Sequence, residues 1–293
     1  RQRQMCIRDR FNGPGGTGRP DHVHVLPLPD GFRGEFRYEQ EDYAIRYAMQ
    51  AVQFVEELVA RGQPPALFIA ESLLSCAGQI PLPDGYLRNV YDIVRLHGGL
   101  CIADEVQVGF GRVGKHFWGF ELQHVIPDIV TVGKPFGNGH PLAAVVTTRE
   151  IANAFNNGME YFNSFGGNPV SCAVGLAVMD VIEKEQLQDH AEQVGNFLLA
   201  QLVELKGRYP DRLGDVRGHG FFLGLEFIRD ASRRPDSQLA RRVVEALRHK
   251  HILLSTDGPD RNVIKFKPPM VFDLANAERL VATLDRVMAS LVD

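Results

Sequence analysis

Short apolar runs alternate with longer amphipathic segments through the first two thirds of the chain. Compact apolar runs are typical of strands buried in a parallel sheet, whereas apolar residues three and four positions apart are typical of helices. The strands predicted in this way are residues 22–29, 66–71, 100–105, 128–133 and 142–148. The predicted helices are residues 40–62, 84–99, 147–155 and 168–187.

Local signals support the predicted helix ends. Gly62 and Gly98 stand where the first two helices should stop, and glycine is the residue that most readily takes the left-handed conformation found there. Thr147 and Glu150 have the spacing of a capping box, which predicts the start of the third helix. The order of strands and helices therefore favours an α/β fold with a mostly parallel sheet and helices on both faces.

The pattern changes near residue 186. Charged helices flank a predicted strand over residues 214–228, and residues 251–272 predict two strands around a Gly/Pro turn. A closing helix covers residues 274–292. We therefore predict a large domain over residues 11–185 and a smaller C-terminal α/β domain over residues 186–293. Residues 1–10 are polar and without periodicity, and we expect them to be a non-native tail.

Composition narrows the classes of function. The 293 residues are 44% hydrophobic and 23% charged, and the net charge is −4, so no basic face for nucleic acid is expected. No apolar stretch is long enough to span a membrane. The four cysteines lie far apart and form no metal-binding spacing, which favours a reducing, cytoplasmic compartment and no bound metal. They are Cys6, Cys76, Cys101 and Cys172.

Three predicted strands end on residues that could do chemistry together. They end on Glu71, Asp104 and Lys134, and the carboxyl ends of neighbouring parallel strands meet at one edge of a sheet. Each residue alone is more often a solvated loop residue. A desolvated lysine can form a Schiff base with an aldehyde, and a carboxylate can keep a pyridine nitrogen protonated. The combination favours pyridoxal 5'-phosphate (PLP) as a cofactor, with Lys134 and Asp104 as catalytic residues.

Longer motifs carry a family resemblance. The stretches "IADEVQVGFGRVGKHFW", "PDIVTVGKPFGNGHPLAAVVTT" and "YFNSFGGNPVSCAVG" resemble the class III aminotransferases, which are PLP enzymes of fold type I. Within that family, "FIAESLLSCAGQIPLPDGY" and "KFKPPM" are most similar to phospho-lyases that act on ethanolamine phosphate or 5-phosphohydroxylysine. The resemblance implies a fold type I large domain, a smaller C-terminal domain and a chain truncated at its N-terminus.

The resemblance also implies roles for individual residues around the cofactor. Lys134 would form the Schiff base, and Asp104 would bind the pyridine nitrogen. Val106 would pack under the ring, while Gln107 would reach its phenolic oxygen. Ser164 would donate a hydrogen bond to the cofactor phosphate from the neighbouring subunit, which implies a homodimer with a shared active site.

The predicted substrate side contains two lysines. Class III enzymes that act on α-amino acids often have an arginine where this chain has Lys265, and Lys267 lies on the same face of a strand. Two ammonium groups suit a phosphate, although a pair of solvated lysines is the plain alternative. Glu71 would lie near the substrate, and Arg217 would either bind substrate or hold the two domains together.

These residues favour a phospho-lyase that eliminates phosphate and ammonia from a phosphorylated amine through an external aldimine. One alternative is a transaminase that moves the amino group to a 2-oxo acid. Another is an inactive fragment, because the cofactor-phosphate loop of relatives is not visible in the sequence. Gly109, Gly111 and Gly114 match a dinucleotide-binding fingerprint, but they follow the strand too late and open no long helix, so a nicotinamide cofactor is disfavoured.

Overall fold

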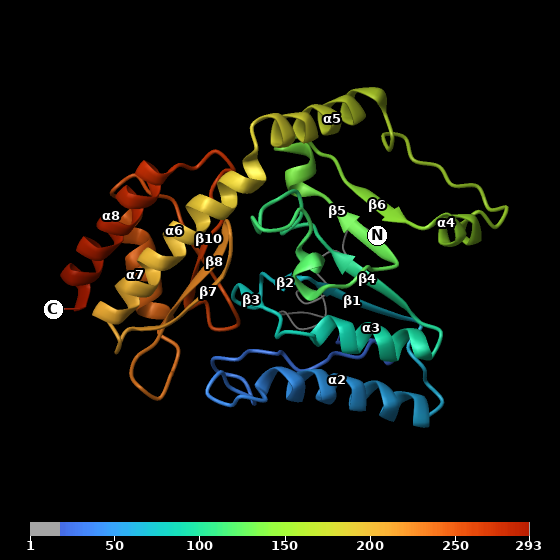
Figure 1. The fold of residues 1–293 in the computed structure, drawn as a ribbon, viewed down its shortest axis with the longest axis horizontal. Coiled ribbons are helices and arrows are strands. Elements are labelled where there is room, and N and C mark those ends of the chain that lie inside the picture. Colours follow the sequence, from blue (N-terminus) through green and yellow to red (C-terminus); the bar gives the residue numbers. More distant parts are fainter. Residues whose placement is uncertain (1–17, 293) are drawn as a thin grey trace.

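Two four-stranded sheets organise residues 18–292, the part of the chain that the computed structural model describes (Figure 1). The predicted tail, residues 1–10, lies outside the described residues. The first sheet contains β1 (Leu67–Glu71), β4 (Leu100–Asp104), β5 (Ile129–Val132) and β6 (Ala144–Thr147) in that order. The second contains β7 (Leu213–His219), β8 (Phe222–Phe227), β10 (Val263–Phe266) and β9 (Ser255–Asp257). A short ribbon, β2 (Leu73–Leu74) and β3 (Ile80–Pro81), completes the strands.

The first sheet has two parallel pairings and one antiparallel pairing at its edge. Strands β1, β4 and β5 run parallel, and β6 pairs antiparallel with β5. The helices of this part of the chain are α2 (Tyr43–Ala60), α3 (Tyr86–Leu96), α4 (Arg149–Phe155) and α5 (Pro169–Lys184). Two short 3-10 turns, η2 (Gly119–Gln123) and η3 (Lys134–Gly137), lie between the strands. This arrangement confirms the predicted α/β class with a mostly parallel sheet.

One face of the first sheet is packed and the other is open. Cys101 and Ala103 of β4 point into a core that α2 and α3 share, because alternate residues of a strand face opposite sides. On the opposite face Leu67 and Ile69 of β1 and Val145 of β6 are exposed. The described residues therefore supply helices to one face, whereas helices were expected on both.

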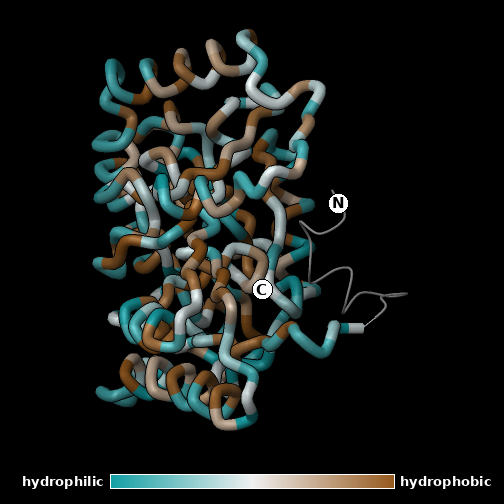
Figure 2. Tube along the Cα trace, turned by 90° about the vertical axis from the view of Figure 1, so that its right-hand side faces the viewer, coloured by the Kyte–Doolittle hydropathy of each residue, from teal (hydrophilic) through white to brown (hydrophobic). Residues whose placement is uncertain are grey.

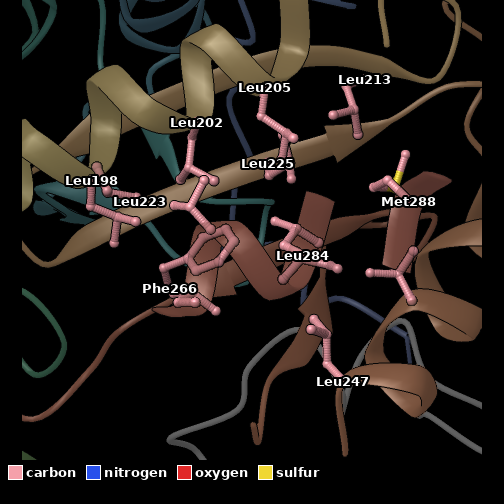
Figure 3. Packing of buried hydrophobic residues seen from close by; sticks show 14 of the residues in the cluster. Leu198, Leu202, Leu205, Leu213, Leu223, Leu225, Leu247, Phe266, Leu284 and Met288 are labelled. Carbon is pink, nitrogen blue, oxygen red and sulfur yellow. The ribbon is translucent and has the colours of Figure 1, made fainter. Parts of the chain in front are cut away.

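The second sheet is antiparallel and is covered by α6 (Leu187–Arg208), α7 (Ser237–Arg248) and α8 (Leu274–Val292). Apolar and polar residues alternate along the outer helices, so each helix can present one apolar face (Figure 2). On α6 that face carries Leu198, Leu202 and Leu205, whose spacing of four and three residues matches the helical repeat. These leucines meet Leu223, Leu225 and Phe266 of the sheet (Figure 3).

The strand predicted over residues 214–228 is wrong in one respect, because the structure folds it into the hairpin β7–β8. The turn requires Gly220, whose φ is 51° and at which an added Cβ would lie 2.5 Å from the backbone carbon of Val113. Only a residue without a side chain fits so close to another backbone. The prediction of one strand passed over Gly218 and Gly220, which mark the turn in the sequence.

Two other local predictions are wrong. Residues 22–29 form no strand, and Pro27 and Pro29 have no N–H to donate to a neighbouring strand. The cap of α4 is Thr148, whose hydroxyl accepts from Ile151 N at 3.3 Å. Thr147, predicted to be the cap, ends β6 and its hydroxyl donates to the carbonyl of Asp128 at 2.8 Å.

Each sheet has its own hydrophobic core, and α5 and α6 are separated at Glu185 and Gln186. A domain boundary near residue 185 agrees with this geometry and stays a prediction. Within residues 18–292, no helix is both long and apolar enough to cross a membrane. The same residues contain no cluster of three metal-binding side chains.

We expect Leu202→Ala to lower the free energy of unfolding by about 2–5 kcal/mol, because it leaves a cavity in the core between α6 and the second sheet. Leu202 is fully buried, whereas its neighbour Val203 is 48% exposed. Val203→Ala is the matched control and should change stability by no more than about 0.5 kcal/mol. Urea denaturation followed by circular dichroism measures both. Equal losses for the two variants would contradict the assigned core.

Candidate functional site

The ends of three parallel strands form one rim of the first sheet. Glu71, the last residue of β1, is paired with Asp104, the last residue of β4, and Asp104 is paired with Thr131 of β5. Paired residues of neighbouring strands point to the same face of a sheet. Lys134 follows three residues after Thr131 and opens the turn η3. The structure thus brings the three predicted strand ends to adjoining positions.

Asp104 keeps one carboxylate oxygen free of protein partners among the described residues. Its Oδ1 accepts a hydrogen bond from Val106 N at 3.0 Å, which turns the chain sharply after β4. The Val106 side chain lies against the backbone before Lys134, since a Cβ on Gly133 would be 3.7 Å from Val106 Cγ1. The segment that carries Asp104 and the segment that carries Lys134 are therefore packed together.

Lys134 has an unusual backbone and an exposed side chain. Its φ is 37°, in the left-handed region that non-glycine residues seldom adopt, and such strain costs about 1–3 kcal/mol. Its ammonium group has no hydrogen bond or ion pair with any described residue. The desolvated surroundings that we expected for this amine are thus not formed by the described residues, whose sheet face beside the rim is open.

A chain of hydrogen bonds runs from the rim to the second sheet. Glu71 Oε2 accepts from the backbone N–H of Ser75 at 2.9 Å and also from its hydroxyl. The hydroxyl of Ser75 in turn accepts from Gln107 Nε2. Gln107 Oε1 accepts from the Lys267 ammonium at 2.7 Å. Three residues predicted for the site, Glu71, Gln107 and Lys267, are therefore joined through one that was not predicted.

The two predicted substrate lysines have different surroundings. Lys267 lies 4.3 Å from the centre of the Phe222 ring, and burial followed by the nearby charge of Lys265 lowers the pKa of Lys267 to about 8. Lys265 pairs with Asp257 at 3.0 Å, and Asp257 also accepts from Gln79 Nε2 at 3.0 Å. Both lysines retain N–H groups beyond these contacts, because an ammonium carries three.

Arg217 is buried and its guanidinium is largely paired. It donates to the Gly78 carbonyl from Nε at 3.1 Å and from one terminal nitrogen at 2.7 Å, and it pairs with Asp215 and Glu226. Burial alone would lower the pKa of Arg217, but the carboxylates of Glu226 and Asp215 outweigh it and raise the pKa. These contacts favour the structural alternative, in which Arg217 fastens the second sheet to the turn after β2. A role in substrate binding stays a prediction.

Ser164 is not brought to the other site residues. It lies in the exposed segment between α4 and α5, and its side chain has no partner among the described residues. Large apolar side chains of the same segment are also exposed, among them Tyr161, Phe162 and Phe165. A role of Ser164 toward a neighbouring subunit stays a prediction.

Sequence reasoning missed Ser75, Gln79 and Asp257. Ser75 and Gln79 are fully buried, and buried polar side chains in a turn signal a hydrogen-bond network only once burial is known. Asp257 reaches Lys265 because β9 and β10 pair with Ser255 opposite Lys265, which places Asp257 diagonally across. A spacing within one strand would not reveal such a pair.

Comparisons with known proteins show what the whole chain is similar to. A sequence model of the family "Aminotransferase class-III" matches residues 13–288. The chain is 53% identical over 278 residues to an alanine–glyoxylate aminotransferase 2-like protein of Drosophila melanogaster, covering 93% of this chain and 56% of that protein. It is 41% identical over 292 residues to ethanolamine-phosphate phospho-lyase homolog 1 of Caenorhabditis elegans, covering 95% of this chain and 62% of the relative.

A solved structure gives the same result for the fold. A phospholyase from Arthrobacter, in complex with phosphoethanolamine, matches with a TM-score of 0.88 and 38% identity. The match covers 95% of this chain and 66% of that one. The chain thus spans between about half and two thirds of the length of these relatives.

Lys267 should react with an acylating reagent along a pH curve whose midpoint is near 8, because burial and Lys265 disfavour its charged form. Competitive labelling with acetic anhydride, resolved by peptide mass spectrometry, measures this midpoint. The control is Lys184 on α5, where the hydrogen bond and charge of Asp180 raise the pKa of the lysine. A Lys267 midpoint as high as that of Lys184 would contradict the assigned surroundings.

Proposed function

The chain belongs to the class III aminotransferases, a family of PLP-dependent enzymes, and from this premise we propose that it acts as a phospho-lyase on a phosphorylated amine. Phosphoethanolamine and 5-phosphohydroxylysine are the substrates in view. The observation that carries the proposal is the pair Lys265 and Lys267, of which Lys265 pairs with Asp257 and Lys267 donates to Gln107 beside the rim of the parallel sheet. The Arthrobacter phospholyase in complex with phosphoethanolamine supports the same substrate class.

The side chains at the rim fit PLP. Lys134 offers an amine with no partner among the described residues, and Asp104 offers a carboxylate oxygen without one. Gln107 uses one of its two amide N–H groups on Ser75, so the second can donate to an oxygen of a ligand. An amine, a carboxylate and an amide donor are the groups that an aldehyde, a pyridine nitrogen and a phenolic oxygen require. When bound, PLP supplies an electron sink for negative charge at the carbon beside the substrate nitrogen.

Each residue then has a definite task. With PLP bound, Asp104 would accept a hydrogen bond from the pyridine nitrogen and would favour its protonated form, because an opposite charge nearby favours the charged form. The free amine of Lys134 removes the proton from the substrate carbon that carries nitrogen. Lys265 and Lys267 bind the phosphate group and stabilise its charge as it departs from the adjacent carbon.

Amino-group transfer is the second candidate reaction. The relative from Drosophila melanogaster carries an aminotransferase name at 53% identity, higher than that of the phospho-lyase homolog. Proton removal by Lys134 is common to both reactions. They differ in whether phosphate leaves the substrate, and the rim residues described above would serve both.

We also propose that two copies of the protein associate. The segment between α4 and α5 and its flanks expose Phe155, Met159, Tyr161, Phe162 and Phe165, a concentration of large apolar side chains that is uncommon on a monomer. A second copy over this segment would bury it and would bring Ser164 to a neighbouring site.

The reducing, cytoplasmic location is proposed from the three described cysteines, Cys76, Cys101 and Cys172, which are free.

Incubation with PLP should give a visible absorbance band that borohydride bleaches, together with release of inorganic phosphate from phosphoethanolamine or 5-phosphohydroxylysine. Lys134→Ala should lose the band and the activity. Lys267→Met should raise the KM for the phosphorylated amine about 10- to 100-fold, the loss expected for one charged hydrogen bond. Lys184→Met, on the exposed surface of α5, is the control with unchanged KM.

The alternatives give distinct results in the same assays. Amino transfer to pyruvate that is faster than phosphate release would identify a transaminase. A protein that stays colourless with PLP and releases no phosphate would support the inactive-fragment alternative.

Sedimentation equilibrium should give twice the mass of one chain. Phe162→Asp should shift the protein towards the monomer, because a buried charge without a partner disfavours association. Leu253→Asp changes an exposed apolar residue between α7 and β9 and should leave the mass unchanged. A monomeric unsubstituted protein at micromolar concentration would contradict the proposed association.

A further inference from the structure

The hydrogen bonds between Glu71 and Lys267 have a single possible direction. The carboxylate of Glu71 can only accept, and the ammonium of Lys267 can only donate. The one hydroxyl hydrogen of Ser75 therefore goes to Glu71, and its oxygen accepts from the amide nitrogen of Gln107. The amide oxygen of Gln107 is left to face Lys267, at 2.7 Å. Reversing the amide would direct N–H groups at the ammonium and remove both bonds.

Ser75 is connected to the second lysine as well. Its backbone carbonyl accepts from Gln79 Nε2 at 2.8 Å, and the same nitrogen donates to Asp257, which pairs with Lys265. Ser75 thus reaches Lys267 through its hydroxyl and Lys265 through its carbonyl. It is fully buried, so water does not compete for either contact.

From this geometry we infer that Ser75 is a positioning residue for the anionic end of the substrate. It fixes the orientation of the Gln107 amide, and the amide in turn holds the Lys267 ammonium beside the rim. The inference rests on the proposed function, because it assigns the task of Lys267 as binding phosphate. Ser75 need not touch the substrate to set where the phosphate binds.

Ser72, close to Ser75 in the chain, has a purely structural hydrogen-bond network. Ser72 is also buried, and its hydroxyl donates to the carboxylate of Glu105. Glu105 then accepts from the backbone N–H groups of Gly119 and Phe120, so this network ends on the backbone of η2. The network of Ser75 ends instead on two ammonium groups that have N–H groups to spare. Ser72 is therefore a matched control for the loss of a buried hydroxyl.

The groups whose charges act on Lys267 are known from the structure. Lys265 and Arg112 disfavour its protonated form, whereas Glu71 and Asp257 favour it. Ser75→Ala leaves all four in the chain and removes the bond that anchors Gln107. Since a carbonyl acceptor stabilises the ammonium, its loss should make Lys267 easier to deprotonate.

The test is competitive labelling of Lys267 with acetic anhydride as a function of pH, on the full chain without added substrate. Ser75→Ala should move the midpoint for Lys267 down by about one pH unit, the equivalent of part of one charged hydrogen bond. Ser72→Ala should leave the midpoint unchanged. Gln107→Leu should give the same displacement as Ser75→Ala, and combining the two should add nothing further, because Ser75 acts through Gln107.

The kinetic measurement separates positioning from catalysis. In phosphate release, Ser75→Ala should raise the KM for the phosphorylated amine about tenfold and change kcat less, while Ser72→Ala should leave KM unchanged. A Lys267 midpoint that is unchanged or higher in Ser75→Ala would overturn the inference, whatever the activity. A lowered midpoint in a protein that releases no phosphate would instead overturn the proposed function and the phosphate-binding task while leaving the contact network in place.

Discussion

Parallel pairing of β1, β4 and β5 is the constraint on which the candidate site depends. Residues in register across parallel strands end at the same edge, so Glu71 and Asp104 become neighbours although 32 residues separate them in the chain. The turn after β5 then places Lys134 next to the segment of Val106. The backbone ladder fixes these positions, and the side chains need only be of the right chemical type.

A second constraint joins the two sheets. Arg217 of β7 donates to Gly78 in the turn after β2, and Lys267, just after β10, donates to Gln107 after β4. They do so in opposite electrostatic settings. Two carboxylates surround Arg217, so its pKa is raised and its guanidinium stays charged and paired. Burial beside another lysine lowers the pKa of Lys267. The largely paired cation of Arg217 holds the two sheets together, and the incompletely paired cation of Lys267 remains open to an anion.

Exposure around the site follows from how much of the sheet is covered. The face that carries Leu67 and Ile69 is open, and Lys134 at its edge is exposed. An apolar sheet face is costly in water, so the described residues present a surface suited to contact with further polypeptide. The described residues around Lys134 do not desolvate its side chain.

The α/β class, the residues that end the parallel strands and the family resemblance could all be read from the amino-acid sequence. Apolar runs and glycine-rich turns encode strand ends locally, so Glu71, Asp104 and Lys134 could be selected without a structure. The hairpin at Gly220, the pairing of Asp257 with Lys265 and the linking position of Ser75 became visible only in the folded chain. Those features depend on which backbones approach across long stretches of chain and on which polar groups lose water together, and neither is encoded in the spacing of residues along one segment.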